Sequence, residues 1–458
     1  MEDVAAVILA AGKGTRMKSD RPKVLHEVCG KSMVEQVIHT AETAGCRRCI
    51  VITGFKGQDV RAAIHEPVEF ADQAEQMGTG HAVLQTEPFL KTDQDGYVLV
   101  ICGDTPLLRA ETLQKLIAAC CRQQAAASVL TAVMDDPAGY GRIIRDSRGT
   151  MQSIVEQKDG TPEELAVHEV NTGTYCFQVH ELFHALHQVK NNNAQGEYYL
   201  TDVFRIMIQD GQTVIPVEAE SSEETLGVNS RRQLAAADRV LRMRKIGELM
   251  DSGISFIDPD HTYIGQDVKI GQDSVLYPGC VLEGCTVIGK HCIIGPGTHL
   301  SNFRCGDFCR LESVYAHDCS MGDRNQAGPF VHLRPQTRIG NDSKIGNFVE
   351  VKNSVIGDHS KLPHLIYCGD ADVGAQVNMG CGSVTVNFNG KDKHRTTIKD
   401  HAFIGCNTNL VAPVTVGRRA FTAAGSTITK DVPDESLAVG RARQRNIEGW
   451  VQKDTYKD

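Results

Sequence analysis

Two different hydrophobic periods divide the sequence. In the first half, short apolar runs alternate with segments whose apolar positions recur every three to four residues. The runs predict buried strands, and the periodic segments predict amphipathic helices. Alternation of this kind predicts an α/β domain over residues 1–228, with a mostly parallel sheet, helices on both faces and ligands at the carboxyl ends of the strands. The strands are expected at "AAVILAAG", "CIVITG", "YVLVICGD" and "ASVLTAVM", and the helices at "SMVEQVIHTAETAG" and "AETLQKLIAACCRQQ".

After residue 252 the apolar period becomes six. Isoleucine or leucine occupies every sixth position from 264 to 300, and two further six-residue registers run from 321 to 351 and from 398 to 428. This repeat is typical of a parallel β-helix, in which one residue per repeat points inward and stacks on the next coil. We therefore predict a β-helix of about ten coils over residues 252–437.

Other segments interrupt or join these halves. Residues 229–251 are rich in Ala, Leu and Arg and predict a connecting helix, and residues 438–458 form a C-terminal tail. The segments "SNFRCGDFCRLES", 301–313, and "NFNGKDKHRTT", 387–397, break the six-residue register. We expect both to leave the β-helix as loops, because loops on a rigid scaffold commonly carry chemistry.

Composition narrows the class of protein. A net charge of −9 argues against general nucleic-acid binding, which requires a basic surface. The N-terminal apolar run is short and follows acidic residues, so neither a signal peptide nor a membrane span is expected. The sixteen Cys are spread over both halves, which favours free thiols in a reducing cytoplasm. Cys46 and Cys49 have redox spacing, but they lack the usual helix start, so neither a redox nor a metal role is expected.

The stretch "LAAGKGTRM", residues 9–17, begins at the end of the first predicted strand. It differs from a Walker loop because Lys13 lies between two glycines. Gly12 and Gly14 let the backbone approach an anion, and Lys13 and Arg16 can neutralise it. The loop therefore indicates phosphate binding without identifying the ligand.

The longer stretch "LAAGKGTRMKSDRPKVL" resembles the signature of sugar nucleotidyltransferases. Further matches follow in order: "QMGTGHAV", "GDTPLL", "GYGRI", "VEQKD", "NTGTY" and "GVNSRRQL". Together with the repeats, the whole chain resembles the bifunctional N-acetylglucosamine-1-phosphate uridylyltransferase/glucosamine-1-phosphate acetyltransferase family. The resemblance implies an α/β Rossmann-like nucleotidyltransferase domain followed by a left-handed parallel β-helix of hexapeptide repeats. It also implies the synthesis of UDP-N-acetylglucosamine for cell-envelope precursors.

For the first half, the resemblance implies in-line transfer of UMP from UTP to N-acetylglucosamine 1-phosphate, with release of pyrophosphate. Asp104 and Asn229 would hold Mg²⁺, and Arg16 and Lys23 would be catalytic, facing the triphosphate with Lys13. The implied nucleotide contacts are Leu9, Ala10, Gly12, Gly14, Lys23, Gln73, Gly78 and Thr79. The implied sugar-phosphate contacts are Gly141, Glu156, Asn171 and Asn229.

For the second half, the resemblance implies acetylation of glucosamine 1-phosphate by acetyl-CoA. His364 would take a proton from the amine, helped by pairing with Glu350. Asn387 could donate to the tetrahedral oxyanion. The implied sugar-phosphate contacts are Arg334, Lys352, Tyr367, Asn378 and Lys393, and the implied acetyl-CoA contacts are Asn387, Phe388, Cys406, Ala424 and Arg441.

Four residues depart from the family pattern. Pro363 stands where an Asn is usual, Ile366 replaces a small hydroxyl residue, Phe388 replaces a Tyr and Cys406 replaces a Ser. All four lie in the half that the resemblance assigns to acetyl transfer. A Cys could act as a nucleophile, but direct attack by the amine needs no such step, so a packing role is favoured for Cys406.

Related enzymes pack three β-helices side by side, so a homotrimer is expected. The tail, with Arg441 and Trp450, either lies near the CoA phosphates of a neighbour or is loosely ordered. One alternative is a nucleotidyltransferase whose β-helix only trimerises or regulates. A second is a catalytically silent scaffold, which the intact "GKGTRM", Lys23 and Asp104 disfavour. A third is a metal-carrying β-helix, but the histidines present no convincing ligand pattern: His332, His359 and His364.

Overall fold

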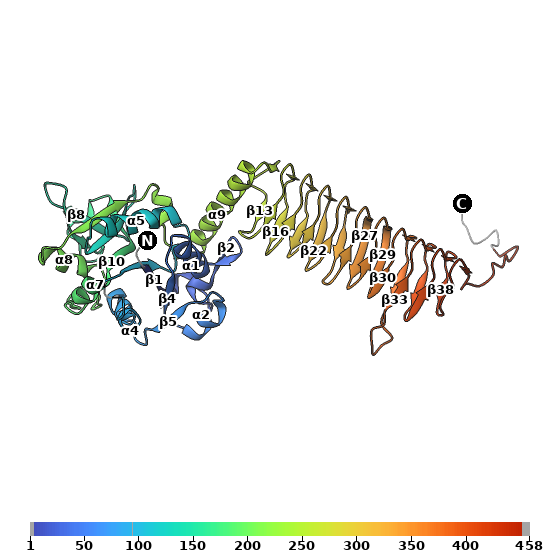
Figure 1. Ribbon diagram of the computed structural model, residues 1–458, viewed down its shortest axis with the longest axis horizontal. Coiled ribbons are helices and arrows are strands. Elements are labelled where there is room, and N and C mark those ends of the chain that lie inside the picture. The colour runs from blue at the N-terminus through green and yellow to red at the C-terminus, as the bar shows by residue number, and fades with distance from the viewer. Residues whose placement is uncertain (1–3, 94, 451–458) are drawn as a thin grey trace. The chain divides into compact units, whose positions relative to one another are not determined.

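The computed structural model describes residues 4–93 and 95–450 of the chain, so the last eight residues of the predicted tail lie outside it. The chain forms two compact units that divide between Leu241 and Arg242. The first unit is an α/β domain and the second is a β-helix (Figure 1).

The first unit is built on a mixed sheet whose main path runs β11-β7-β10-β6-β1-β4-β5. All four predicted strands are confirmed, as β1, β4, β6 and β7. Neighbours on this path are parallel except around β10, which is antiparallel to both β6 and β7. The expectation of a mostly parallel sheet missed this strand, which follows the antiparallel pair β8–β9 and turns back against β8 without a long crossover. The strands are β1 Val4–Leu9, β2 Glu27–Val28, β3 Lys31–Ser32, β4 Arg48–Thr53, β5 Glu69–Asp72, β6 Tyr97–Cys102, β7 Ala127–Val133, β8 Gly141–Arg145, β9 Met151–Val155, β10 Glu169–Gln178 and β11 Val214–Glu218.

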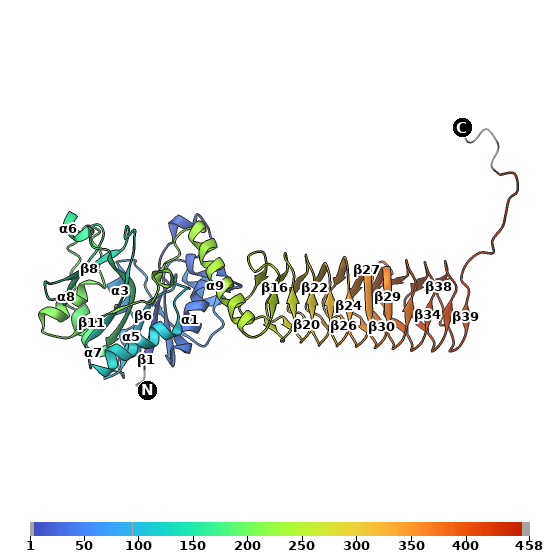
Figure 2. The ribbon, with the colours of Figure 1, turned by 90° about the horizontal axis from the view of Figure 1, so that it is seen from above.

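Helices cover both faces of this sheet, as predicted (Figure 2). Successive residues of β1 point to opposite faces, so Val7 and Ile8 belong to two separate apolar clusters. Helix α1 begins with a capping box, in which Ser32 and Glu35 bond each other's backbone amides. The helices are α1 Met33–Thr43, α2 Gly57–Ala63, α3 Thr79–Leu84, α4 Glu87–Leu90, α5 Ala110–Arg122, α6 Pro162–Leu165, α7 Val179–Leu186, α8 Asp202–Gln209 and α9 Arg231–Asp251, with 3₁₀ turns η1 Thr15–Met17, η2 Lys23–Leu25 and η3 Ser222–Thr225.

The second unit is a left-handed parallel β-helix of short strands, each paired in parallel with the strand three repeats later (Figure 2). Two faces form one sheet of nineteen strands and the third face forms a sheet of nine, from β14 to β36. The strands are β12 Ser255–Phe256, β13 Tyr263–Ile264, β14 Lys269–Ile270, β15 Val275–Leu276, β16 Val281–Glu283, β17 Val287–Ile288, β18 Ile293–Ile294, β19 His299–Ser301, β20 Arg304–Cys305, β21 Arg310–Leu311, β22 Val314–His317, β23 Ser320–Met321, β24 Gln326–Ala327, β25 Val331–Leu333, β26 Arg338–Ile339, β27 Lys344–Lys352, β28 Val355–Ile356, β29 Lys361–Gly369, β30 Ala371–Val373, β31 Asn378–Met379, β32 Val384–Val386, β33 Thr396–Ile398, β34 Phe403–Ile404, β35 Asn409–Val411, β36 Val414–Val416, β37 Phe421–Thr422, β38 Thr427–Ile428 and β39 Leu437–Ala438.

The six-residue registers are confirmed, since their residues fill the interior of the coils, with Ile270 the one half-buried member. A second buried position lies two residues before each of these. At two of these positions, a serine hydroxyl donates a hydrogen bond to a glycine carbonyl of the next coil: that of Ser274 to Gly289 across 2.9 Å, and that of Ser343 to Gly357 across 3.1 Å. These coils are therefore joined to the next by their interior as well as by their strands.

One of the two predicted loops is wrong. Residues 301–313 remain in the β-helix as β20 and β21, because the repeat shortens to five residues between Leu300 and Cys305 and the inward position stays in line. The other loop is confirmed. The chain leaves the coil after β32 and returns at β33, and within this excursion Phe388 pairs with Lys393.

Thiols in the described residues are free, and burial raises the pKa of Cys46 and of Cys49 to about 12. Such thiols are poor nucleophiles. Among the described residues, no helix combines the length and hydrophobicity that a membrane crossing requires.

Candidate active sites

A cavity of about 270 Å³ lies at the carboxyl ends of β1 and β6, where a parallel arrangement places ligands. It brings together residues that are more than 90 positions apart in the sequence. Its lining includes eight of the residues predicted from the motifs: Leu9, Ala10, Gly12, Lys23, Gln73, Gly78, Thr79 and Asp104.

Glycines shape the walls of this cavity. Gly14 has φ +59° and a side-chain carbon there would lie 2.5 Å from Cβ of Lys23. Gly78 has φ +107°, and a side-chain carbon there would lie 2.5 Å from the carbonyl oxygen of Tyr198. Both positions therefore require glycine for the fold itself. Gly12 is different, because an added side-chain carbon would meet no atom within 4 Å and would face the cavity.

Three polar side chains converge beside the cavity. Lys23 lies in η2, Asp104 follows β6 and Asn229 lies just before α9. The Lys23 ammonium pairs with the Asp104 carboxylate and donates to Oδ1 of Asn229 across 3.0 Å. Both members of the ion pair are mostly buried, with side chains 15% and 17% exposed. Two oxygen atoms thus already surround one positive charge, which is the donor set that Mg²⁺ prefers.

The predicted cations Lys13 and Arg16 are exposed. Arg16 lies in η1, immediately after the Gly-rich loop, and does not line the cavity.

Three of the four predicted sugar contacts, Gly141, Glu156 and Asn171, lie at the end of the β8–β9 pair that is opposite to its turn, and the fourth, Asn229, lies beside Lys23. Gly141 and Asn171 are direct partners in the register of β8 and β10, and Asn171 donates to the hydroxyl of Tyr175 across 2.8 Å. Glu156 follows β9 and accepts a hydrogen bond of 3.0 Å from Thr201. Burial raises the pKa of Glu156, with further contributions from nearby acidic side chains. A second cavity, of about 520 Å³, is lined by Glu156 and Thr201 and extends along α8.

Sequence reasoning missed several lining residues of these cavities. Gln76 lies within the motif "QMGTGHAV" and donates to the carbonyl of Gln73, and Glu197 lines the cavity at the ends of β1 and β6. The backbone of Tyr198 forms the wall against Gly78. The only local signal was the polar and aromatic run "GEYYLTD" before α8, which has no periodicity that distinguishes it from an ordinary loop.

On the β-helix, the loop after β32 builds a polar cluster. Asn387 donates to a carboxylate oxygen of Asp370 and, across 3.4 Å, to the hydroxyl of Tyr367. The Lys352 ammonium lies 4.0 Å from the Asp370 carboxylate. Its hydrogen-bond contact with the adjacent Lys393, together with its charge, lowers the pKa of Lys393. Two ammonium groups side by side form an attractive site for a phosphate.

Asp370 is the residue of this cluster that sequence reasoning missed. Burial opposes its charge, but hydrogen bonds from Asn353 and Asn387 and the charge of Lys352 hold the pKa of its carboxyl below the usual value. Asp370 therefore remains ionised and orients the side chains around it.

Glu350 does not pair with His364, contrary to expectation. Its carboxylate accepts a hydrogen bond of 2.8 Å from Arg334, its neighbour on the preceding coil. His364 is exposed and lies opposite Asn347 in the register of β27 and β29. Within the described residues its ring has no hydrogen bond or ion pair.

The other predicted residues are spread along the β-helix. Cys406 and Ala424 occupy the same corner of adjacent coils, where the amide of Gly425 bonds the carbonyl of Cys406 across 2.8 Å. Arg441 is exposed after β39. Asn378 lies beside Lys361 in the register of β29 and β31, and no hydrogen bond in the described part of the chain joins it to the Tyr367 cluster.

The departures from the family pattern have different structural consequences. Ile366 is 2% exposed and packs in the interior of the coils, so it does not face a ligand. Phe388 is 54% exposed on the loop, and Cys406 is also exposed. The carbonyl of Pro363 lies so close to Gly346 that residue 346 has no room for a side chain.

Comparison with known proteins gives matches over both units. Residues 6–195 match the MobA-like NTP transferase domain, and residues 261–302 and 318–353 match the bacterial transferase hexapeptide repeats. The gap between the two repeat matches contains the shortened coils. Proteins named "Bifunctional protein GlmU" are similar along nearly the entire chain. That of Geobacillus sp. strain WCH70 is 52% identical over 99% of this chain and 98% of its own. That of Halalkalibacterium halodurans is 51% identical over 99% of both. That of Listeria monocytogenes serotype 4b strain CLIP80459 is 48% identical over 98% of both.

Proposed function

We propose that the chain, which belongs to the GlmU family of bifunctional proteins, carries out the family's two reactions at the two sites described above. The β-helix acetylates glucosamine 1-phosphate with acetyl-CoA, and the α/β domain transfers UMP from UTP to the resulting N-acetylglucosamine 1-phosphate. The products are UDP-N-acetylglucosamine and pyrophosphate. The observation that carries the proposal is that one chain holds both a cavity beside the Gly-rich loop, with a pair of oxygen donors, and two adjacent lysines on the β-helix, Lys352 at the end of β27 and Lys393 on the loop after β32.

In the uridylyltransferase, an oxygen of the sugar phosphate attacks the α-phosphorus of UTP in line. The new O–P bond forms as the bond to the β-phosphate oxygen breaks, and pyrophosphate leaves with the negative charge. Catalysis therefore depends on positioning and charge neutralisation. Lys23 and Arg16 supply positive charge to the phosphates, and the open backbone at Gly12 lets them approach.

Asp104 and Asn229 would hold Mg²⁺. Bound there, the ion would supply charge neutralisation to the phosphates of the nucleotide. In the present arrangement the Lys23 ammonium occupies the point between these two side chains. With Asp104 and Asn229 engaged by Mg²⁺, the Lys23 ammonium would be available to the phosphates of the nucleotide.

In the acetyltransferase, the amine of glucosamine 1-phosphate attacks the carbonyl carbon of acetyl-CoA. His364 takes the amine proton, and CoA leaves as the thiolate when the tetrahedral intermediate collapses. Arg334, Lys352 and Lys393 would hold the sugar phosphate. To donate to the oxyanion, the amide of Asn387 must give up one of its two hydrogen bonds, to Asp370 or to Tyr367. The bond of 3.4 Å to the Tyr367 hydroxyl is the weaker one.

We also propose that the protein is a homotrimer whose acetyltransferase sites lie between subunits. Within one chain His364 is exposed and Glu350 is already engaged by Arg334, so the site lacks an orienting partner for its base. Nearby, Phe330 and Phe348 stack with ring centres 5.4 Å apart and are 60% and 55% exposed. An apolar surface of this kind on a rigid prism is suited to contact with an identical prism. The free thiols support a cytoplasmic location.

The narrower candidate is a nucleotidyltransferase whose β-helix only trimerises or regulates. Glucosamine 1-phosphate and acetyl-CoA, supplied without UTP, distinguish the two. Release of free CoA thiol supports the bifunctional enzyme. If no thiol is released while pyrophosphate still forms from UTP and N-acetylglucosamine 1-phosphate, the β-helix has no acetyltransferase activity and the narrower candidate holds.

A further inference from the structure

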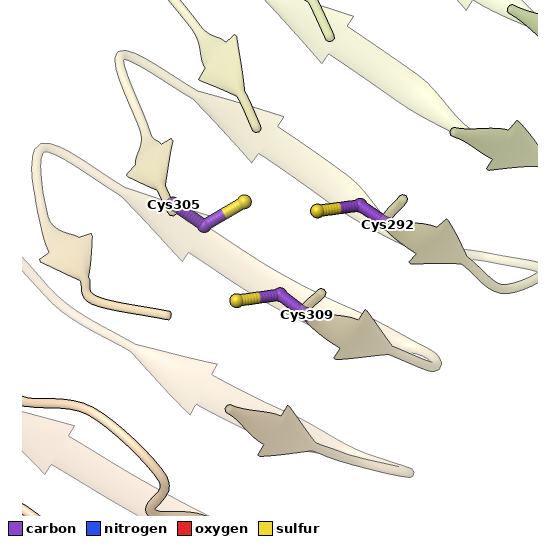
Figure 3. Close-up of side chains that lie close together, drawn as sticks. All are labelled: Cys292, Cys305 and Cys309. Atoms are coloured by element: carbon purple, nitrogen blue, oxygen red, sulfur yellow. The ribbon is translucent and has the colours of Figure 1, made fainter. Parts of the chain in front are cut away.

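Three buried cysteines meet inside the β-helix, at the coils where the repeat shortens. The sulfur atoms of Cys292, Cys305 and Cys309 all lie within 4.8 Å of one another. Cys292 and Cys309 come from the same face of neighbouring coils, and Cys305 points toward them from another strand (Figure 3). Their residues are 0%, 7% and 1% exposed, respectively. In the described residues this is the only group of three or more His, Cys, Asp or Glu whose ligand atoms converge in this way.

Packing accounts for small residues at two of these positions but not for sulfur. Cys292 and Cys309 stand where other coils carry a serine, and each donates to a glycine carbonyl of the next coil as the serines do. The thiol of Cys292 lies 3.3 Å from the carbonyl oxygen of Gly306, and that of Cys309 lies 3.2 Å from that of Gly322. A hydroxyl would satisfy the same carbonyls, so the coil contacts do not require cysteine.

Cys305 occupies the other kind of inward position, which large aliphatic residues fill in most coils. It pairs with Met321 on the following coil, and Ile288 occupies the position before it in the same stack. A thiol here leaves room beside the two other sulfur atoms. Three sulfur groups from two kinds of inward position therefore converge at one place, whereas the buried thiols of Cys280, Cys319 and Cys368 occupy such positions without joining the group.

A thiolate is the form of cysteine that binds metals, so a cation held by these three sulfur atoms would displace at least one thiol proton. The convergence of the sulfur atoms within 4.8 Å, inside a coil stack that excludes water, is the feature that suits a bound ion.

We propose that Cys292, Cys305 and Cys309 form a three-sulfur site for a soft monovalent cation, Cu⁺. Sulfur donors select soft ions such as Cu⁺ or Zn²⁺ over Mg²⁺ and Ca²⁺, which prefer oxygen. Structural Zn²⁺ sites are almost always four-coordinate, whereas the described residues provide three ligands. In a buried site, one thiolate balances the charge of a monovalent ion, and a divalent ion would require a second buried thiolate or leave net charge.

The test uses the reduced full-length protein under anaerobic conditions. Cu⁺ is delivered from a chromophoric chelator that competes for it, and metal per chain and sulfur-to-copper charge-transfer absorption are measured. The test variants are Cys305→Val, which restores an aliphatic side chain, and Cys292→Ser, which restores the usual hydroxyl. The matched control is Cys280→Ser, because Cys280 is equally buried and donates to the carbonyl of Gly295 across 3.1 Å but lies outside the cluster.

We expect wild type and Cys280→Ser to retain one Cu⁺ against the chelator. Cys305→Val and Cys292→Ser should each lose more affinity than the roughly 100-fold that loss of an outer-shell partner can cost. If circular dichroism shows that Cys305→Val does not fold, the Cu⁺ affinity of Cys292→Ser is compared with those of the wild type and Cys280→Ser. Equal Cu⁺ uptake by the cluster variants would overturn the proposal, because the ion would then be bound by exposed thiols such as Cys285. Tighter retention of Zn²⁺ than of Cu⁺ would overturn the assignment to a monovalent ion.

Discussion

The ammonium of Lys23 donates a hydrogen bond to the side-chain oxygen of Asn229 across 3.0 Å, although the two residues are 206 positions apart. The same ammonium is paired with Asp104. A lysine therefore holds the oxygen pair that we assign to Mg²⁺, and metal and ammonium compete for one position. This competition gives the metal assignment a test that does not depend on turnover.

Replacing Lys23 by Met should strengthen Mg²⁺ binding in the absence of nucleotide, because no ammonium then competes for Asp104. The same change should lower uridylyl transfer by about 100- to 1,000-fold, since a charge that stabilises the leaving group is lost. Calorimetric titration with Mg²⁺ and a pyrophosphate assay measure the two effects. Lys91→Met, at an exposed lysine, is the control and should change neither quantity. An unchanged Mg²⁺ affinity in Lys23→Met would place the metal elsewhere.

Gly12→Ala should separate folding from nucleotide binding. The added methyl group meets no protein atom within 4 Å but enters the cavity where the phosphates are proposed to lie. We expect an unchanged melting temperature and a UTP affinity at least about tenfold weaker, or about 1.4 kcal/mol. Gly78→Ala is the contrasting variant, because its positive φ and the Tyr198 carbonyl predict a lower melting temperature as well. Normal UTP binding by Gly12→Ala would show that the ligand does not approach this backbone.

Much of the fold follows from the period of the sequence, and the exceptions have physical reasons. The inward positions of the β-helix were predicted because one aliphatic residue per six must be buried. The course of residues 301–313 was not predicted, because one repeat there has five residues and interrupts the six-residue period. Cys305 and Leu311 nevertheless point inward. The antiparallel strand β10 carries no local signal, because strand direction is decided by connections and not by side chains.

The candidate sites were predictable where a motif specifies a backbone shape and not where partners are chosen in three dimensions. Gly78 and Lys23 belong to motifs, and both line the nucleotide cavity. Glu350 and Arg334 lie 16 residues apart, one coil of the β-helix, and a six-residue pattern does not say which neighbour a carboxylate will bond. Asp370 was missed for the same reason, since its role depends on contacts with Asn387 from the loop.

Glu156→Gln should make the protein more stable at neutral pH and less active. The folded pKa of Glu156 is raised by burial, so the folded state binds the proton more tightly than the unfolded chain does. Wild type therefore loses stability as pH rises from about 4.3, the ordinary value for Glu, toward the raised folded pKa. Denaturant unfolding of both proteins should show a larger free energy of unfolding for Glu156→Gln at pH 7. At pH 4 the two free energies should be equal.

The same substitution tests the sugar contact. If the Glu156 carboxylate accepts hydrogen bonds from sugar hydroxyls, Glu156→Gln should raise KM for N-acetylglucosamine 1-phosphate and leave KM for UTP unchanged. Because the pKa of Glu156 is raised, kcat/KM of the wild type should also decline on the acid side of its pH profile at a pH above the ordinary pKa of Glu. A variant with an unchanged sugar KM would remove Glu156 from the site.

Phe348→Asp should dissociate the proposed trimer. A carboxylate in place of an exposed, stacked ring would have to be buried at the contact between subunits. Sedimentation at a fixed protein concentration should show a monomer that retains uridylyl transfer and has lost acetyl transfer. Val355→Asp, at an exposed apolar residue on β28 of the other sheet, should remain trimeric. A trimeric Phe348→Asp protein would move the interface away from this ring pair.

The central claim is that one chain carries two independent catalytic sites, and His364→Ala tests it most directly. Free CoA thiol and pyrophosphate are followed separately, with His359→Ala, an exposed histidine of the same β-helix, as the control. We predict that thiol release falls by about 100- to 10,000-fold in His364→Ala, while pyrophosphate formation from N-acetylglucosamine 1-phosphate and UTP is unchanged. Undiminished thiol release, or a parallel loss of both products from a folded protein, would contradict the account.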